Sequence, residues 1–227
     1  MKTNDIQTIK QVANLLEQLN FEYWIDSGTL LGLYRDSKLI ESDKDIDISI
    51  IQNENQINDL VELLKKKGFG KVFLKKYNNK IHKIKILRKI GQRTVDISIF
   101  RKFEDELLMP VLRLEKIFDN LKKFNFFIVV KLLFAKTFII LSKWLDYEID
   151  FNSAMFKSLI RKKELWCYPS DMVLPSIKSS RYGFYYPKNT DSFLIFRYGD
   201  WKTPLLKWDT ENSDKGFILD KRHSELL

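Results

Sequence analysis

Apolar residues in the first half of the chain follow two different periods. In 4–19 and 54–67 they recur every three or four positions, which predicts two amphipathic helices. In 21–25 and 45–51 they are continuous or alternate with polar residues, which predicts two short strands with a buried face. Helical and strand segments therefore succeed one another along this half of the chain.

A hairpin is predicted further on. Residues 81–87 and 94–100 both alternate between apolar and polar positions, and 89–92 carry the turn between them. A symmetric turn of two or four residues places Lys85 opposite Asp96, on the polar face of the pair. The hairpin therefore brings a basic and an acidic side chain together.

The pattern is less regular after residue 100. We expect helical pieces broken by Pro110 in 101–123, and another helix in 153–165. Proline and aromatic residues in 166–187 indicate extended segments and turns, and 191–198 predicts a short helix. The last dozen or so residues are polar and are expected to be a mobile tail.

The stretch 124–145 is unusually apolar, but Lys131, Lys136 and Lys143 interrupt it. At about 100° per residue these lysines fall in one arc of a helix. The opposite arc is apolar and consists of Phe126, Val130, Leu133, Phe134, Phe138 and Leu141. The charges argue against a membrane span. Two interpretations remain: a core helix whose lysines face water, which we favour, or a helix lying on an anionic membrane.

These elements together predict an α+β fold with α/β character, in which helices flank a sheet. A length of 227 residues fits one domain, 1–227. Within it, we expect 1–103 to form a catalytic core and 104–227 a helical and irregular extension that binds substrate.

Composition narrows the class of protein. Hydrophobic residues make up 44% of the chain, which excludes an intrinsically disordered protein. A net charge of +9 fits an anionic partner equally as well as lysines on solvated faces. Cys167 is the single cysteine, so an internal disulfide is excluded. The first residues lack the apolar segment of a signal peptide, so we expect a cytoplasmic protein, either free or peripheral at the inner face of the cell membrane.

The chemistry of the chain gathers around an acidic strand. Asp45 and Asp47 are two residues apart in a predicted strand, so both side chains point to the same face. Two carboxylates side by side repel one another unless a cation lies between them, and oxygen ligands suit Mg²⁺ or Mn²⁺. Asp96 on the neighbouring hairpin strand is expected to complete this site as a third ligand.

A small-residue turn precedes the acidic strand. Ser27, Gly28 and Thr29 follow an apolar run and begin a helical turn, so their backbone N–H groups are suited to binding phosphate. Basic residues that could neutralise further phosphate charge are Arg35, Lys38 and Lys85. Asp26 could orient the turn or cap the helix, and capping is the favoured role.

Two segments resemble the LicD/fukutin family of the nucleotidyltransferase superfamily. The first is IDSGTLLGLYRDSKLIESDKDIDISI, with its G-T-L-L-G and D-x-D-I-D runs. The second is FRYGDWKTP, which is similar to that family's Tyr-Gly-Asp-Trp/Tyr-x-x-Pro element. The resemblance reaches from Tyr23 to Pro204, with no clear motif in 101–165. It implies a nucleotidyltransferase-type mixed sheet.

The resemblance also implies an activity. Family members transfer phosphocholine, ribitol phosphate or glycerol phosphate from a CDP-linked donor to a hydroxyl of a cell-surface glycan such as lipopolysaccharide, teichoic acid or capsule. CMP is released. Asp45, Asp47 and Asp96 would then hold the metal and act in catalysis, with Asp96 either a ligand only or also the base that accepts the hydroxyl proton. Choline is the favoured alcohol.

The second segment supplies candidates for a substrate pocket. These are Tyr198, Gly199, Asp200 and Trp201, next to Arg197. Trp201 or Tyr198 could stack on a cytosine or surround a quaternary ammonium group by cation–π attraction. Ordinary packing is an equally good explanation of these aromatic residues. His82 shares a face with apolar neighbours, so a structural histidine is favoured over a catalytic base.

Two other functions fit the same residues. One is transfer of a nucleotide to a small molecule, an RNA end or a protein, which the acidic strand would allow. The other is a non-catalytic RNA-binding module that uses the lysines. No paired strand aromatics of an RNA-reading motif are present, so no nucleic-acid partner is expected. A CDP-linked donor and a glycan or glycolipid acceptor are the expected partners, with 124–145 as a peripheral membrane contact.

Overall fold

The computed structural model describes residues 2–77, 79–111, 126–145, 149–150, 164–205, 208 and 210–219. The elements of the first half confirm most of the predicted order. They are α1 (Lys2–Gln18), β1 (Tyr23–Ile25), α2 (Ser27–Arg35), β2 (Asp45–Ile51), α3 (Glu54–Lys66), β3 (Lys71–Tyr77), β4 (Lys80–Leu87), β5 (Thr94–Phe103) and β6 (Glu106–Pro110).

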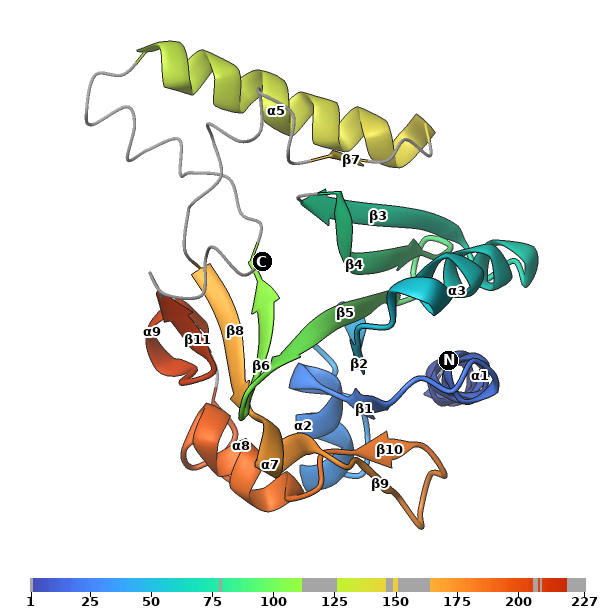
Figure 1. Ribbon diagram of the computed structural model, residues 1–227, viewed down its shortest axis with the longest axis vertical. Helices are drawn as coiled ribbons and strands as arrows, with labels where there is room; N and C mark the ends of the chain where they lie inside the picture. Colours follow the sequence, from blue (N-terminus) through green and yellow to red (C-terminus); the bar gives the residue numbers. More distant parts are fainter. Residues whose placement is uncertain are drawn as a thin grey trace.

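The second half contributes one long helix and several short elements. They are α5 (Phe126–Leu145), β7 (Ile149–Asp150), β8 (Glu164–Pro169), α7 (Ser170–Val173), β9 (Ile177–Lys178), β10 (Tyr185–Tyr186), α8 (Thr190–Tyr198), α9 (Thr210–Ser213) and β11 (Phe217–Leu219). The strands of this half are short, and most of them extend or edge the sheet that the first half begins (Figure 1).

One mixed sheet organises the molecule. Its main path runs β11-β8-β6-β5-β4-β3-β7, and β2 pairs with β5 in parallel and with β1 in the antiparallel sense. The long strand β5 is the junction, because its first part pairs with β2 and β4 and its last residues pair with β6. The described residues therefore form the expected α+β fold with a mixed sheet flanked by helices. The division of the chain at residue 103 stays a prediction.

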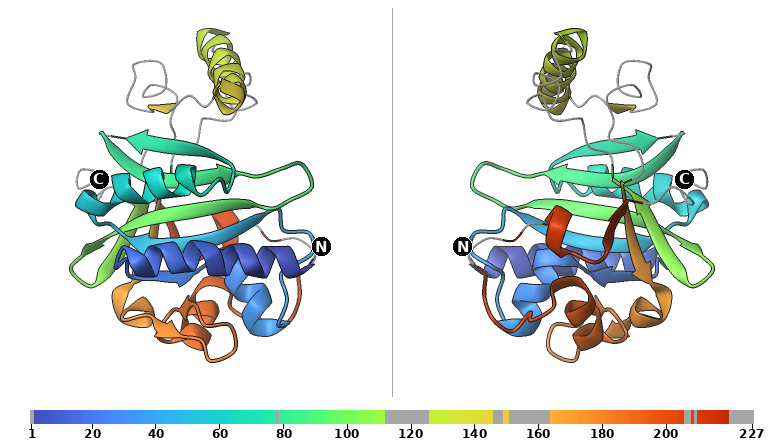
Figure 2. Two further views of the ribbon diagram at one scale, coloured as in Figure 1. Left: turned by 90° about the vertical axis from the view of Figure 1, so that its right-hand side faces the viewer. Right: turned by 90° about the vertical axis from the view of Figure 1, so that its left-hand side faces the viewer.

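The two faces of the sheet have different partners. Helices α1 and α3 lie along one face, whereas α9 is on the other side (Figure 2). Strand β2 turns Ile46, Ile48 and Ile50 into the core, where all three are fully buried. Because strand residues alternate between faces, Asp45 and Asp47 project to the side opposite these isoleucines. The predicted arrangement of the acidic strand is confirmed.

Three predictions about the middle and end of the chain are wrong. Residues 101–110 are not helical, because β5 continues to Phe103 and pairs with β6, so that Pro110 ends a strand. Glu164 and Leu165 begin β8 rather than end a helix. Phe217–Leu219 form β11 on the edge of β8 rather than a mobile tail. Residues 112–123, 153–163 and 220–227 lie outside the described residues.

Strand β3 was not predicted. Its sequence, KVFLKKY, carries three lysines and has no clean alternation, yet it pairs with β4 along its whole length. The hairpin was predicted correctly, and its register places Lys85 opposite Asp96 as expected. Tertiary pairing with β4 decides the conformation of β3 where its own pattern does not.

Helix α5 confirms the predicted helix but not the favoured interpretation of its faces. Leu133, Phe134, Phe138 and Leu141, from the arc expected to face the core, are exposed. The residues that α5 buries are Val129, Leu132 and Ala135. No helix among the described residues is both long enough and apolar enough to cross a membrane.

Candidate active site

Three carboxylates meet at the start of β2. Asp45 and Asp47 project from the strand, and Asp43 lies in the loop just before it. One carboxylate oxygen from each residue lies within 4.8 Å of the others. All three residues are half-buried. Asp43 was not predicted as a site residue, because it precedes the strand and its orientation depends on the loop.

The electrostatics of this cluster favour a bound cation. Burial, together with a hydrogen bond to Asp45 and the negative charge of that residue, raises the pKa of Asp43 to about 6. Burial also raises the pKa of Asp47 well above its ordinary value, against the attraction of Lys83, while Asp45 and Asp96 add repulsion. Asp43 and Asp47 therefore hold protons more tightly than free carboxylates do, because burial and neighbouring negative charge outweigh the attraction of nearby cations.

The donor set fits a divalent metal ion. Three carboxylates within bridging distance are oxygen ligands of the kind that Mg²⁺ and Mn²⁺ take. Asp43, Asp45 and Asp47 could therefore hold a metal, with room for further ligands from a substrate.

The first turn of helix α2 lies against the carboxylate cluster. Asp26 caps the helix, as favoured from the sequence, and accepts a 2.6 Å hydrogen bond from the Ser27 N–H. Ser27 has a φ of 50°, a left-handed conformation that is uncommon for a non-glycine residue. A Cβ on Gly28 would clash with Asp43 Oδ2, so glycine at this position lets the carboxylate approach the helix. Thr29 is buried behind the site, where its hydroxyl accepts a hydrogen bond from the Asp47 N–H.

A buried arginine ties this turn to the C-terminal part of the chain. Arg197 of α8 donates to Asp26 at 2.8 Å and to Asp214 at 2.7 Å, and all three side chains are at most 4% exposed. Arg197 also donates to Ser27 Oγ at 3.3 Å. The sequence placed Arg197 near a pocket but gave no sign of Asp214, which lies in no motif. The strained turn is therefore held by two segments that are far apart in sequence.

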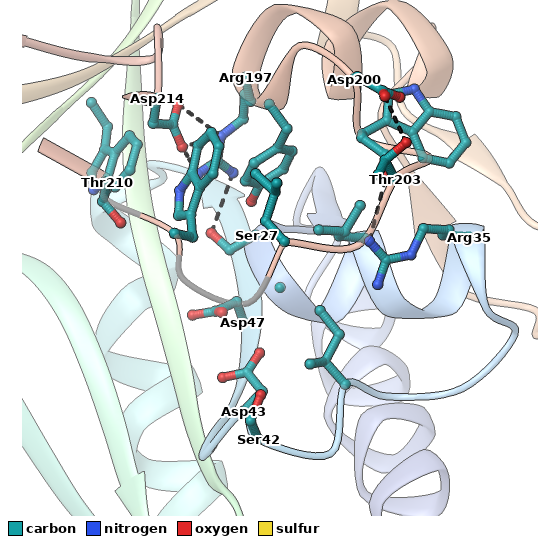
Figure 3. Close-up of a pocket in the computed structure, with 18 residues that line it drawn as sticks. Ser27, Arg35, Ser42, Asp43, Asp47, Arg197, Asp200, Thr203, Thr210 and Asp214 are labelled. Carbon is teal, nitrogen blue, oxygen red and sulfur yellow. Dashed lines mark hydrogen bonds and ion pairs between the residues drawn. The ribbon is translucent and has the colours of Figure 1, made fainter. Parts of the chain in front are cut away.

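A cavity of about 450 Å³ opens above the carboxylates. In Figure 3, Asp43 and Asp47 lie together on one side of it, with Ser27 and Arg197 above them and Asp200 and Thr203 farther along. Its aromatic lining comes from Trp166, Tyr198, Trp201 and Trp208. The cavity thus combines a cluster of negative charge with flat aromatic surfaces.

A second, smaller cavity of about 210 Å³ shares part of its lining with the first. Ser27, Asp47 and Trp166 line both cavities. The smaller one is also lined by Lys75 and Lys83, and by His82, which is 2% exposed. Asp47 therefore lines two cavities with different walls: the larger one has four aromatic side chains, and the smaller one has two lysines.

The structure places Asp96 outside the carboxylate cluster. Lys83 Nζ lies 2.7 Å from one of its oxygens and Lys85 Nζ 2.9 Å from the other. Burial alone would raise the pKa of Asp96, but the two ammonium groups outweigh it and hold the pKa below its ordinary value. Lys83 was not singled out from the sequence, although it occupies the same face of β4 as Lys85. Both lysines neutralise this acid.

Two predicted phosphate-binding residues are placed less favourably. Arg35 lines the larger cavity but forms a two-pronged ion pair with Asp36, at 2.9 and 3.0 Å. A third group, Nη1, donates to the Trp201 carbonyl at 3.3 Å, so Arg35 also fastens the C-terminal segment to α2. Lys38 is exposed in the loop after α2 and is not part of the cavity wall.

The predicted pocket residues lie at the cavity as a group, with one exception. Tyr198, Asp200 and Trp201 line it, and Gly199 ends α8 with a φ of 64°, in the left-handed region. Asp200 accepts a 2.6 Å hydrogen bond from Thr203, which lowers its pKa. Trp208 packs against Tyr198 with ring centres 5.0 Å apart, an aromatic pair that the sequence did not suggest.

Comparison with known proteins identifies the domain that contains the carboxylate cluster. The family model described as LicD/FKTN/FKRP, nucleotidyltransferase domain, matches residues 20–126. An uncharacterized protein of Rickettsia typhi is 37% identical over 102 residues, which are 45% of this chain and 30% of that protein. One of Rickettsia prowazekii is 34% identical over 73 residues, or 32% of this chain and 27% of that protein. The matches thus span about 30% of the length of these relatives.

Two solved structures of the antibiotic-resistance factor ANT(2'')-Ia also align with part of the chain. A solution structure is 16% identical and covers 50% of this chain and 56% of its own, with a TM-score of 0.36. A crystal structure in complex with adenylyl-2''-tobramycin is 15% identical and covers 46% of this chain and 54% of its own, with a TM-score of 0.33.

Proposed function

Residues 20–126 belong to the LicD/FKTN/FKRP nucleotidyltransferase-domain family, and from this premise we propose that the protein is a metal-dependent phosphotransferase. It transfers a phospho-alcohol group from a CDP-linked donor to a hydroxyl of a glycan or glycolipid of the cell surface. Phosphocholine is the favoured group. The reaction takes place in the cytoplasm or at the inner face of the membrane. It involves no nucleic acid.

One observation carries the proposal: Asp47 of the carboxylate cluster lines two cavities. A transferase must hold a donor and an acceptor with their reacting atoms close together. Asp47 lines both the 450 Å³ and the 210 Å³ cavity, so two substrates can reach it from different sides. Aromatic walls on one side fit a cytosine ring or a choline group, because both bind to the faces of aromatic side chains.

Asp43, Asp45 and Asp47 would hold the metal ion. When bound, the ion would supply positive charge to the phosphate oxygens of the donor. Its ligands are fixed by the protein itself, since the Asp47 N–H bonds to Thr29 and Gly28 leaves room for Asp43. The cluster is thus preorganised, which is what charge stabilisation in a transition state requires.

The start of α2 binds phosphate in this proposal. Ser27 and Gly28 line the cavity at the first turn of a nine-residue helix, where backbone N–H groups and the helix dipole attract anions. Arg197 acts on this turn indirectly, because its two buried ion pairs leave it little freedom to move towards a ligand. Its role is to hold Ser27 in the required conformation.

The acceptor hydroxyl attacks the distal phosphorus of the donor. An oxygen–phosphorus bond forms to the acceptor, the bond between that phosphorus and the CMP oxygen breaks, and the hydroxyl proton passes to water. Asp96 is a poor base for this proton, because Lys83 and Lys85 lower its pKa. We therefore assign Asp96 the role of holding the two lysines beside Asp47 rather than that of catalytic base.

The purified protein tests the proposal directly. It is incubated with Mg²⁺, a panel of glycan acceptors and CDP-choline, CDP-ribitol or CDP-glycerol, and release of CMP is followed. We expect CMP from one donor, with CDP-choline first, and none without metal. Ribitol or glycerol phosphate in place of choline would change the alcohol but keep the reaction. No CMP from any donor, together with nucleotide transfer from CTP or ATP, would instead show a nucleotidyltransferase.

A further inference from the structure

Helix α5 exposes an apolar face at one end of the molecule. The fractional exposures are 80% for Phe127, 68% for Phe134, 37% for Phe138 and 52% for Leu141. At about 100° per residue, these four side chains fall within an arc of roughly 60° on the helix. Four large apolar side chains on one line are more than the single exposed residues that are normal on a soluble protein.

The helix is placed so that this face is accessible. In Figure 1, α5 is the outermost element beyond β3 and β7, on the side away from α1 and α2. Both views in Figure 2 show it at the end of the molecule beyond β3, away from the other helices. The inner side of the helix buries Val129, Leu132 and Ala135, so the outer arc is free to meet a partner.

The charge on α5 has one sign. Residues 126–145 contain three lysines and no acidic residue. Lys131 and Lys136 are exposed, and Lys131 lies three and four residues from Phe134 and Phe127, directly beside the apolar arc. This arrangement is complementary to a surface that has an apolar layer beneath a layer of anionic groups.

We propose that α5 docks on the surface of an anionic lipid bilayer. Its four-residue apolar arc enters the boundary between headgroups and acyl chains, and Lys131 beside the arc reaches anionic headgroups. The helix lies in the plane of the membrane, in keeping with its inability to span one. A second copy of the chain fits the face less well, because facing helices would bring lysines of like charge together.

Vesicle co-sedimentation of the full chain tests this proposal. We expect binding to vesicles of equal parts phosphatidylcholine and phosphatidylglycerol, weaker by about tenfold or more on pure phosphatidylcholine, and reduced by salt. Absence of binding to the anionic vesicles would overturn the proposal. So would a dimer that depends on α5, seen by light scattering without vesicle binding.

Paired variants assign the binding to α5. Phe127→Ser with Phe134→Ser should abolish sedimentation, whereas Ile90→Ser with Ile177→Ser, which removes equally exposed side chains elsewhere, should not. Lys131→Gln should weaken binding about fivefold. Thermal unfolding shows whether each variant remains folded. Equal binding by the α5 variants and the controls contradicts the proposal, whether or not the enzymatic reaction proposed above is correct.

A matched lysine control completes the set. Lys65→Gln removes one exposed charge from α3 and leaves α5 intact. If vesicle binding arose only from the net charge of the chain, this variant would weaken it as much as Lys131→Gln does. We expect at most a small effect.

Discussion

Asp96 and the carboxylate cluster lie on neighbouring strands, but their surroundings carry opposite charge. Asp96 on β5 has two lysine partners, and its pKa is lowered. Asp43 and Asp47, at β2, face other carboxylates, and their pKa values are raised. Register pairs Asp47 directly with Asp96, so the difference arises between adjacent positions of one sheet.

The comparison teaches which acids are structural and which await a ligand. Two lysines neutralise Asp96, and Arg197 neutralises Asp26 and Asp214. The cluster of Asp43, Asp45 and Asp47 contrasts with both, because its carboxylates face one another. Leaving three acids together costs stability, because like charges repel. Such a loss of stability is typical of functional sites, where charged groups are placed to bind a ligand rather than to stabilise the fold.

The largest expected effect comes from removing Asp47. We expect Asp47→Asn to lower CMP release by about a thousandfold or more, because it removes a metal ligand and several kcal/mol of transition-state stabilisation. The variant should unfold at the same or a higher temperature, since one repelling charge is gone. Activity close to that of the wild type would show that Asp47 is not part of the reaction.

The buried arginine gives the second largest effect. Arg197→Met leaves Asp26 and Asp214 buried without a cation, which should lower the free energy of unfolding by about 3 kcal/mol or more. Lys178→Met, which breaks an exposed ion pair with Glu17, should have a much smaller effect on the free energy of unfolding. Urea unfolding of both variants makes the comparison, and equal losses would contradict the structural role of Arg197.

Asp96 gives a prediction about pH. Its pKa is lowered in the folded protein, so the stability it contributes is present above its unfolded pKa of 3.8 and is lost as pH falls through its folded pKa. Asp96→Asn should therefore cost about 2 kcal/mol at neutral pH, between the values for exposed and buried pairs, and progressively less in strong acid. Urea unfolding at several pH values measures this.

The matched control for Asp96 is an exposed acid. Asp36→Asn breaks the ion pair with Arg35 at the surface and should cost under about 1 kcal/mol throughout. A loss at Asp96 that does not change with pH would mean that packing, rather than charge, accounts for it.

The smallest expected effect separates the site from the fold. Gly28→Ala puts a Cβ against Asp43 Oδ2 and should weaken metal binding about tenfold by displacing one ligand. The fold should be unharmed, because alanine favours a helix. Gly32→Ala is the contrast, since its Cβ would meet the Lys38 carbonyl and the Ile40 N–H, which are backbone groups. It should lower the unfolding temperature more than Gly28→Ala does.

What could be predicted from the sequence was local in origin. Asp45 and Asp47 follow from strand alternation, and the Lys85–Asp96 pair follows from hairpin register. Asp43 could not be predicted, because its orientation depends on a loop fixed by Arg93, which donates to the Asp43 and Ile40 carbonyls from fifty residues away. Long-range contacts of this type leave no period in the sequence.

The same limit explains the other differences. Strand β3 forms because β4 pairs with it, and Asp214 becomes a site residue because Arg197 reaches it across the fold. The faces of α5 were assigned from its lysines, yet the side that packs inward includes Ala135 and Leu132 on the lysine side of the helix. Periodicity identified this helix, but its orientation depends on neighbouring elements.

Metal binding to the purified protein tests the central claim most directly. Titration of the wild type, Asp43→Asn and Asp96→Asn with Mn²⁺, followed by calorimetry or paramagnetic resonance, needs no knowledge of the substrate. We predict that the wild type binds, that Asp43→Asn weakens binding by about a hundredfold or more, and that Asp96→Asn changes it by less than about threefold. Loss of binding in Asp96→Asn with retention in Asp43→Asn would contradict the assignment of the metal to Asp43, Asp45 and Asp47.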